Sequence, residues 1–279
     1  MFPGFRLFPL MLLALCANAR GTEDLSDFKE EVEPLTQYID RHGRSLNWGE
    51  IMAGPEPIIY IGEVHWDVAL RKELAAHMDE VKTAGITHVA LEMFGDNHQP
   101  LLDRYCVDAS CRDKVHAALK EGWDYFDESY MAVVDSAREQ NIPVLAVDLP
   151  AEAYAKMKKR CLESKPPYDF DPAKTRRECT LGMLECKARD CRMADNLSLF
   201  LQKNKQARVL VLVGSNHADV TRQPQHLSDL HGLASRSYIA FFDDTVYKRA
   251  LDLSRWRRQR VLFPLPKEIA HYDGGLRIP

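Results

Sequence analysis

Two short segments of similar pattern lie far apart in the chain, each after an apolar run. In the first, Gly62 and Glu63 precede His65, and in the second, Gly214 is followed three residues later by His217. Imidazole and carboxylate groups can ligate a divalent metal ion. They can also act as general base and acid on a water molecule, since clustered imidazole and carboxylate groups shift one another's pKa towards neutrality. The sequence therefore predicts a polar site for metal binding or hydrolysis, provided that the fold brings the two segments together.

Four apolar runs rich in β-branched residues are the elements that would do so. Each run is short, continuous and followed by helical sequence, which is typical of strands buried on both faces of a parallel sheet. These runs are Ile58 to Ile61, His88 to Leu91, Val144 to Val147 and Val209 to Val213. We expect a fifth strand at Ser235 to Phe242.

The predicted strand ends carry most of the polar residues of interest. Glu63 and His65 follow the first strand, Glu92 ends the second, Asp148 ends the third, and His217 follows the fourth. In an open parallel sheet the carboxyl ends of the strands share one edge, where ligands usually bind. We therefore expect the two histidines and the two glutamates to converge in one cleft. Each of them alone would also suit an exposed strand end, and Asp148 before Leu-Pro also makes a good turn.

The sequence between the strands is mainly helical in pattern. Asp67 to Gly85 places apolar residues on one helical face and ends at a glycine, and two longer helical stretches cover about 95–140 and 151–205. We predict an α/β fold with an open, mainly parallel sheet flanked by helices and an inserted helical subdomain formed by these two stretches. The C-terminal segment from Leu265 to Pro279 is expected to be an exposed tail.

The N-terminal residues 1–19 have the pattern of a signal peptide. A positive charge at Arg6 precedes an apolar core, and Ala17 and Ala19 form a cleavage signature. We expect an exported protein, periplasmic or secreted, with one domain over residues 20–279 and its core at about 57–242. A rival interpretation is lipidation at Cys16, which the bulky Leu15 before it disfavours.

Six cysteines remain after the predicted signal peptide, an even number in a chain bound for an oxidising compartment. We therefore expect disulfides that staple the helical parts, with Cys106 and Cys111 as the best single pair. The competing interpretation is metal binding, but the cysteine spacing matches no zinc pattern of the CxxC type.

Composition excludes some classes of partner. The chain has 279 residues, of which 46% are hydrophobic, so that it can bury a sizeable core. Its net charge is -4, without a block of like charges, which gives no electrostatic footprint for nucleic acid or an anionic membrane surface. No later apolar run approaches the ~20 residues needed to span a bilayer.

Five motifs in order, from about Pro57 to Phe242, are similar to those of a known family. They are GExH after the first strand, ALEMF, GWDYFDESYMAVVDSAREQNIPVLAVDLP, RDCRMADNL and VLVLVGSNHAD. Together they resemble the ChaN-like proteins of the haem-binding uptake and Tiki superfamily, which are related to the erythromycin esterase-like and TraB/Tiki proteins.

Resemblance to ChaN implies an exported protein that binds haem in iron uptake, with homodimerisation as one option. A haem iron held by Tyr or His needs an exposed ligand on an apolar platform, and the sequence identifies none. We interpret the tyrosines of the helical stretches instead as aromatic residues that pack in the fold. They are Tyr105, Tyr125, Tyr130 and Tyr154.

Resemblance to the wider superfamily implies instead a hydrolase acting on a small molecule or a peptide. His65 would then activate water or bind metal, Glu63 and Glu92 would orient it or ligate the metal, and His217 would complete the site. Arg189 would stabilise developing negative charge, although its helix can equally be read as an ordinary amphipathic one. We interpret the chain as a ChaN-like haem- or iron-binding protein. The alternative is a hydrolase that uses the residues named above, with a divalent metal ion as the other candidate cofactor.

Overall fold

The computed structural model describes residues 41–66, 68–163, 174–241, 261–263 and 274–277. The predicted signal peptide and Cys16 lie outside these ranges. The chain divides into a central unit, Trp48–Ser237, and a second unit formed by the residues before and after it. The prediction of one domain over residues 20–279 stays a prediction.

The central unit contains four parallel strands in the order β2, β5, β3, β4. Their bounds are Ile58–Glu63 for β2, His88–Gly95 for β3, Val144–Asp148 for β4 and Val209–Gly214 for β5. Every residue of β2, β4 and β5 is buried, as expected for strands covered on both faces. The predicted α/β fold with a mainly parallel sheet is confirmed, and all four predicted strands are present.

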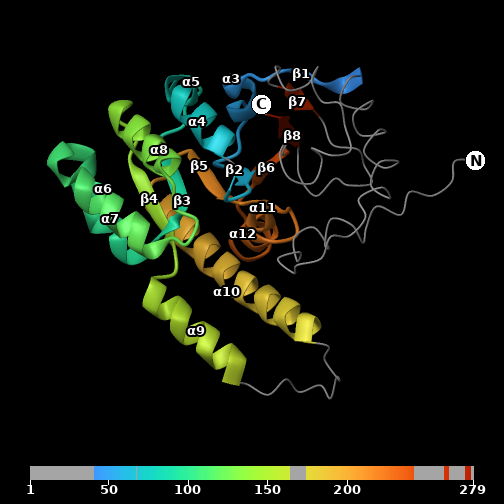
Figure 1. Cartoon of the computed structure of the whole chain (residues 1–279). Coiled ribbons are helices and arrows are strands. Elements are labelled where there is room, and N and C mark those ends of the chain that lie inside the picture. The colour runs from blue at the N-terminus through green and yellow to red at the C-terminus, as the bar shows by residue number, and fades with distance from the viewer. Residues whose placement is uncertain (1–40, 67, 164–173, 242–260, 264–273, 278–279) are drawn as a thin grey trace, which may run out of the picture. The chain divides into compact units, whose positions relative to one another are not determined.

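Helices flank these strands (Figure 1). Within the central unit they are α3 (Trp48–Met52), α4 (Val68–Ala76), α5 (Met78–Thr83), α6 (Gln99–Val107), α7 (Arg112–Gly122), α8 (Glu128–Glu139), α9 (Ala151–Glu163), α10 (Lys174–Lys203), α11 (Ser215–Ala218) and α12 (Gln223–His231). Two 3₁₀ turns are added, η2 (Asp96–His98) and η3 (Ala109–Cys111). The helix α10 packs against β4, α9 and α12, while α4 packs against α8.

The segment after β2 forms two helices rather than one. His77 lies between α4 and α5 with φ −119° and ψ 25°, outside helical geometry, so that the helix is interrupted there. Gly85 then takes a positive φ of 88°, which suits glycine after a helix end. The predicted glycine stop is therefore present, although an interruption precedes it.

The second unit includes short strands from both ends of the chain. Its described strands are β1 (Arg44–Ser45), β7 (Val261–Phe263), β8 (Gly274–Arg277) and most of β6 (Ser235–Phe241). Strand β8 pairs in parallel with β6 and antiparallel with β7, and β7 pairs antiparallel with β1. The predicted fifth strand is confirmed. The expectation of an exposed tail is wrong for Gly274–Arg277, because these residues form the ladder between β6 and β7.

The helices of the described ranges do not include a membrane-spanning candidate, because none of them is both long and apolar enough to cross a bilayer.

The predicted Cys106–Cys111 disulfide is wrong, because both residues are free cysteines in the structure. The two cysteines lie on different elements, since the extended Asp108 ends α6 and caps η3. The thiol of buried Cys111 instead donates a hydrogen bond to the Asp108 carboxylate at 3.7 Å. Cys191 also forms no disulfide. The side chains of Cys161, Cys179 and Cys186 lie outside the described residues.

Cys106 and Cys111 should react with an alkylating reagent in denaturant without any reductant, because neither sulfur is bonded to another. Peptide mass mapping of the labelled protein measures this, with a sample reduced first as the control. If both peptides take up label only after reduction, the assignment of two free thiols is incorrect.

Candidate functional site

The carboxyl ends of β2, β3 and β5 place polar side chains together. The register of β2 and β5 sets Glu63 opposite Gly214, the last residue of β5. The pairing of β3 with β4 shifts after Leu91, so that Glu92 lies in an irregular part of its strand. Such irregularities redirect side chains at functional edges. The Glu92 carboxylate accepts a hydrogen bond from the Gly214 N–H at 2.5 Å, which joins the ends of β3 and β5.

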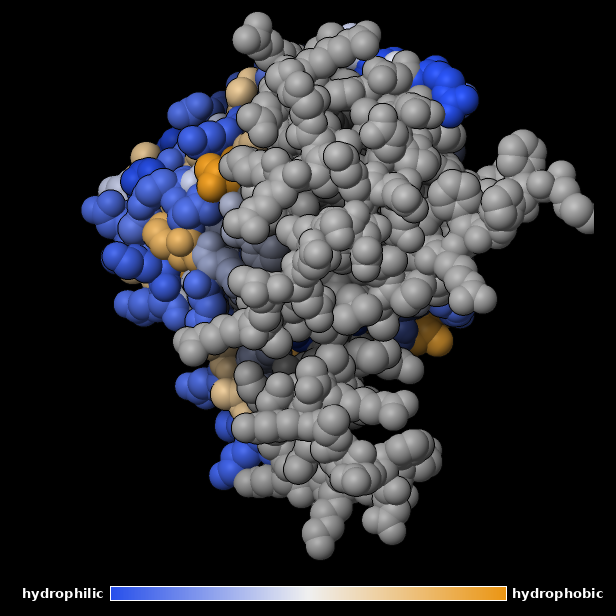
Figure 2. Space-filling model, turned by 45° about the vertical axis from the view of Figure 1, so that its right-hand side comes forward, coloured by the Kyte–Doolittle hydropathy of each residue, from blue (hydrophilic) through white to orange (hydrophobic). Residues whose placement is uncertain are grey.

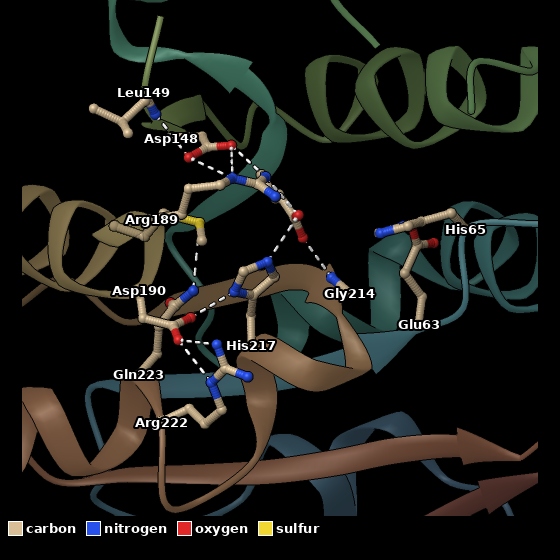
Figure 3. Close-up of polar contacts among 12 residues, drawn as sticks. Glu63, His65, Asp148, Leu149, Arg189, Asp190, Gly214, His217, Arg222 and Gln223 are labelled. Carbon is tan, nitrogen blue, oxygen red and sulfur yellow. Dashed lines mark hydrogen bonds and ion pairs between the residues drawn. The ribbon is translucent and has the colours of Figure 1, made fainter. Parts of the chain in front are cut away.

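His217 lies between two carboxylates (Figure 3). Its Nδ1 is 2.5 Å from Asp190 Oδ1, and its Nε2 is 3.3 Å from Glu92 Oε1. The short helix α11, which directly follows β5, carries this histidine, whereas Asp190 comes from α10. Arg222, just before α12, donates to the other oxygen of Asp190 at 2.7 Å. All three members of the Asp190, His217 and Glu92 chain are buried.

Arg189 joins the ends of β3 and β4. Its Nη2 donates to Glu92 at 2.7 Å, and its Nε donates to Asp148 at 2.9 Å. Asp148 therefore forms an ion pair with Arg189 in the site, in addition to its position before a turn. Two further residues on the same helical face of α10 also make contacts: Asn196 donates to the Val147 carbonyl at 2.8 Å, and buried Met193 accepts a hydrogen bond from Gln223.

Glu63 and His65 form a second group beside the first. The Glu63 carboxylate contacts His65 Nδ1 at 3.0 Å and accepts hydrogen bonds from Tyr130 at 2.7 Å and Arg71 at 2.6 Å. Arg71 is fully buried and also donates to Asp127 on its other side. Glu63 is thus held in place from three directions, and it fixes the orientation of the His65 ring.

Gly214 connects the two groups, because the His65 ring occupies the space where a side chain would be. A Cβ atom at Gly214 would lie 2.8 Å from His65 Cε1 and 2.9 Å from its Nε2. The same Cβ would be 3.4 Å from the Glu92 carboxylate. The ring nitrogen that Glu63 does not contact therefore faces Gly214, as Figure 3 shows, and the Glu92 carboxylate is close to the same point. A glycine is required here for space rather than for its φ.

The inner group has strongly shifted protonation equilibria. Burial alone would raise the pKa of Glu92, but the positive charges of His217 and Arg189 outweigh it and hold the pKa well below its usual value. Burial alone would likewise lower the pKa of His217, yet Glu92 and Asp190 raise it to about 10. At neutral pH His217 is therefore an imidazolium whose two N–H groups point at carboxylates.

The neighbouring arginine and aspartate respond in the same way. Burial would lower the pKa of Arg189, but Glu92 and Asp148 raise it. For Asp148, burial raises the pKa despite the Arg189 charge beside it. Arg189 thus stays charged, and its charge is shared between two carboxylates.

An aromatic face adjoins the second group. The Tyr125 ring stacks on His65 with centroids 4.9 Å apart, and Trp123 meets the His65 ring edge-on, also at 4.9 Å. Tyr125 is 47% exposed, and Trp66, next to His65 in sequence, is 59% exposed. In Figure 2 most of the visible described residues are hydrophilic. Trp66 and Tyr125 are among the few large hydrophobic residues that are exposed in the described part of the chain. We call Trp123, Tyr125 and His65 the aromatic face.

The metal set predicted from the sequence comprised His65, His217, Glu63 and Glu92. In the structure both nitrogens of His217 and both oxygens of Glu92 already contact protein groups. A metal ion there would have to displace a proton and several hydrogen bonds. The metal interpretation, and the catalytic roles assigned to these residues and to Arg189, stay predictions.

Sequence reasoning missed several residues that complete the site. Asp190 and Tyr130 both lie within the family motifs. For Asp190 the sequence offered a signal, because this acidic residue directly follows Arg189 in the motif RDCRMADNL. Arg71 had no such signal, because it stands next to the apolar residue Leu70 in a helix that looked ordinary. Tyr125 lies in the loop between α7 and α8, whereas the sequence pattern favours a packing aromatic in a helical stretch.

Comparison with protein families finds a match over residues 53–181 to the model described as haem-binding uptake, Tiki superfamily, ChaN. None of the curated proteins matches the chain. The family resemblance seen in the motifs is therefore confirmed for the part of the chain that contains Glu63, His65, Glu92 and Asp148.

Solved structures of the same fold include three of similar extent. A structure described as cofacial haem binding to ChaN of Campylobacter jejuni has a TM-score of 0.56 at 17% identity, covering 71% of this chain and 86% of that one. The type III effector HopBA1 has a TM-score of 0.53 at 14% identity, covering 82% and 90%. An H289N mutant of the erythromycin esterase EreC, in its open conformation, has a TM-score of 0.50 at 12% identity, covering 90% and 93%. At these identities the likeness concerns the fold.

Substitution of Gly214 by alanine should displace the His65 ring, because the new Cβ would lie 2.8 Å from it. We expect a loss of about 1–3 kcal/mol in the free energy of unfolding, measured by urea denaturation. The matched control is Gly122→Ala, since a Cβ at Gly122 meets nothing within 4 Å. If both variants unfold at the same urea concentration, the close approach of His65 to Gly214 is incorrect.

The charge of His217 should be visible by NMR as a ring protonated on both nitrogens at neutral pH, with a pKa of about 10. Because this folded-state pKa lies above the ordinary 6.5, the stability gained is fully present below pH 6.5 and is lost as the pH rises through about 10. Asp190→Asn should lower the pKa by roughly one pH unit or more, because it removes a negative partner, and His217→Gln assigns the signal. A ring that titrates near pH 6.5 in the unaltered protein would contradict this electrostatic account.

Proposed function

We propose that the chain is a ChaN-like protein of the haem-binding uptake and Tiki superfamily, and that it binds haem on its aromatic face as an exported component of iron uptake. The observation that carries this proposal is an exposed tyrosine, Tyr125, stacked on His65 within the part of the chain that the family model matches. The similar ChaN of Campylobacter jejuni is described as binding haem cofacially.

The residues present fit the requirements of haem. Haem needs an oxygen or nitrogen ligand for the iron and an apolar surface for the macrocycle. Tyr125 offers a phenol on a residue that is 47% exposed, and the Trp123 ring, with its centroid 5.8 Å from that of Tyr125, offers apolar area beside it. Haem also has two propionates, but the positive groups of the described site, Arg71, Arg189 and His217, are already paired with carboxylates. The fit therefore rests on the aromatic residues.

Tyr125 is the best candidate ligand among the four tyrosines named from the sequence. Tyr105 is buried and donates to Asp135, while Tyr130 is buried and donates to Glu63. Tyr154 is less exposed than Tyr125 and lies under the Arg189 guanidinium at 5.6 Å from its ring centroid. Only Tyr125 combines a large exposed fraction with a place on the aromatic face.

His65 has a supporting role in this proposal. Glu63 contacts its Nδ1, and its Nε2 faces Gly214 within the site. The imidazole therefore presents the flat side of its ring to Tyr125 rather than a nitrogen to the exterior. It positions the phenol and contributes to the surface against which a macrocycle would lie.

A hydrolase is the second candidate function, and one observation favours it. The Glu63–His65 pair, 3.0 Å apart, has the arrangement of a carboxylate that orients an imidazole general base. The Nε2 of His65 faces the charged Arg189 and Glu92 group, where a small-molecule or peptide substrate would have to bind. His217 would serve there as a fixed positive charge, because its pKa of about 10 makes it a poor base.

Haemin titration followed by visible absorbance tests the proposal. We expect a saturable spectral shift for the unaltered mature protein, and a weaker one for Tyr125→Phe, which keeps the ring but removes the ligand oxygen. The apparent Kd should rise by about tenfold or more, which corresponds to roughly 1.4 kcal/mol. The double variant His65→Ala/His217→Ala should still show a shift, because neither histidine supplies the iron ligand.

Tyr105→Phe is the matched control, since it also removes one tyrosine hydroxyl but from a buried position beside Asp135. Sedimentation of the same samples shows whether haem brings two copies of the chain together. An unaltered protein that gives no saturable shift would overturn the haem proposal and leave the hydrolase as the better account. Equal shifts in Tyr125→Phe and Tyr105→Phe would show that Tyr125 is not the ligand.

A further inference from the structure

A second cluster of metal-ligand side chains lies on α10 and α12, outside the residues of the strand-end site. Asp195 of α10 and His226 and His231 of α12 each have one ligand atom within 4.8 Å of those of the other two. The Sγ of Cys191, one turn before Asp195, is 3.7 Å from His226 Nδ1. We propose that Asp195, His226 and His231 hold a zinc ion that joins α10 to α12, with Cys191, which contacts His226 but is not part of the 4.8 Å group, as the fourth ligand.

Local sequence explains why the four side chains converge. Cys191 and Asp195 are four residues apart on α10, so they lie on one face of the helix. Helix α12 begins with a proline in its first turn and ends at His231, where Gly232 adopts the left-handed conformation with φ 62°. The two helices pack against each other. The carboxyl end of α12 also favours a nearby cation.

The chemistry of the donors selects zinc. Two imidazoles, a thiolate and a carboxylate form a mixed nitrogen, sulfur and oxygen set, which Zn²⁺ accepts in tetrahedral geometry. Zinc bonds of about 2.0–2.3 Å place neighbouring ligand atoms roughly 3.3–3.8 Å apart. The sulfur–nitrogen distance of 3.7 Å in this cluster falls in that range. His231 Nε2 and Asp195 Oδ1, at 2.9 Å, are now hydrogen-bonded, and a metal ion would replace the shared proton.

An ordinary surface pair does not have this composition. His116 and Glu128, for comparison, lie 2.8 Å apart on α7 and α8 as a histidine and a carboxylate, and no third donor joins them in the described metal-ligand groups. The α10–α12 cluster adds a second histidine and a thiol to such a pair. Its residues are half-buried, so that an ion can enter from solvent and still be partly shielded.

A bound zinc ion would act on the strand-end site through the two helices. Asp190, which contacts His217, directly precedes Cys191 on α10, and its other partner Arg222 directly precedes α12. Fixing α12 to α10 would hold Arg222 and Asp190 in their present contact. The zinc site is thus structural, and it stands independently of the proposal of haem binding.

Zinc binding to the full-length mature protein, stripped with a chelator and dialysed, tests the inference. Elemental analysis should find a single equivalent of Zn²⁺ after equilibrium dialysis, and the midpoint temperature of unfolding should rise on zinc addition. With Co²⁺ as a probe, absorbance should show tetrahedral bands and a sulfur-to-metal charge-transfer band. Cys191→Ser should lose the charge-transfer band and weaken metal binding by about tenfold or more.

The double variant His226→Ala/His231→Ala should lose both the bound equivalent and the thermal shift, while His116→Ala should keep them. Circular dichroism establishes that the variants are folded. An unaltered protein without stoichiometric zinc, or a double variant that binds zinc as tightly as the unaltered protein, overturns the inference. Haemin titration of the double variant separates the two proposals, because the aromatic face lacks all four zinc ligands and its haemin binding should be unchanged.

Discussion

The rest of the site depends on the buried carboxylate of Glu92. A carboxylate without exposure to water is expensive to bury unless charges and hydrogen bonds compensate it. Glu92 receives three such partners from separate elements: the Gly214 N–H from β5, Arg189 from α10 and His217 from α11. Removing any of these partners would leave the buried charge of Glu92 less well compensated. The three contacts therefore hold the ends of the parallel strands and the helix α10 in one arrangement.

The repeated Gly and His pattern looks symmetrical in sequence, yet the two histidines have different environments. His217 lies between Glu92 and Asp190, is almost completely buried, and carries a charge at neutral pH. His65 contacts one carboxylate, is 20% exposed at its side chain, and packs against Tyr125 and Trp123. The pattern therefore encodes a common backbone turn after a strand, and the surrounding elements determine what each imidazole does.

Much of the fold was predictable because both faces of the sheet are buried, which leaves continuous apolar runs in the sequence. The convergence of Glu92 with His217 follows from the shared edge of parallel strands. Asp190 and Arg71 were not predictable in the same way, since helical residues reach the site by tertiary packing that no local pattern records. The even number of cysteines led to a wrong prediction of a Cys106–Cys111 disulfide, because the count says nothing about geometry. Asp108 places the two cysteines on different elements. The strand Gly274–Arg277 was not predicted, because two of its four residues are glycines, which are depleted in strands.

The division of the site into a buried and an exposed part bears on what it can do. Within the buried part, the positive charges of Arg189 and His217 are paired with Glu92 and with the further carboxylates Asp148 and Asp190. The shifted pKa values of Glu92, Arg189 and His217 keep each of them in a single charge state near neutrality. Groups fixed in this way are poor proton carriers, because an effective general base has a pKa near the working pH. Of these groups, Glu92 lies close to the His65 ring on the Gly214 side of the site. The groups still available to a ligand are then the His65 ring and the aromatic side chains beside it, so that both the haem proposal and the hydrolase alternative depend on this exposed part of the site.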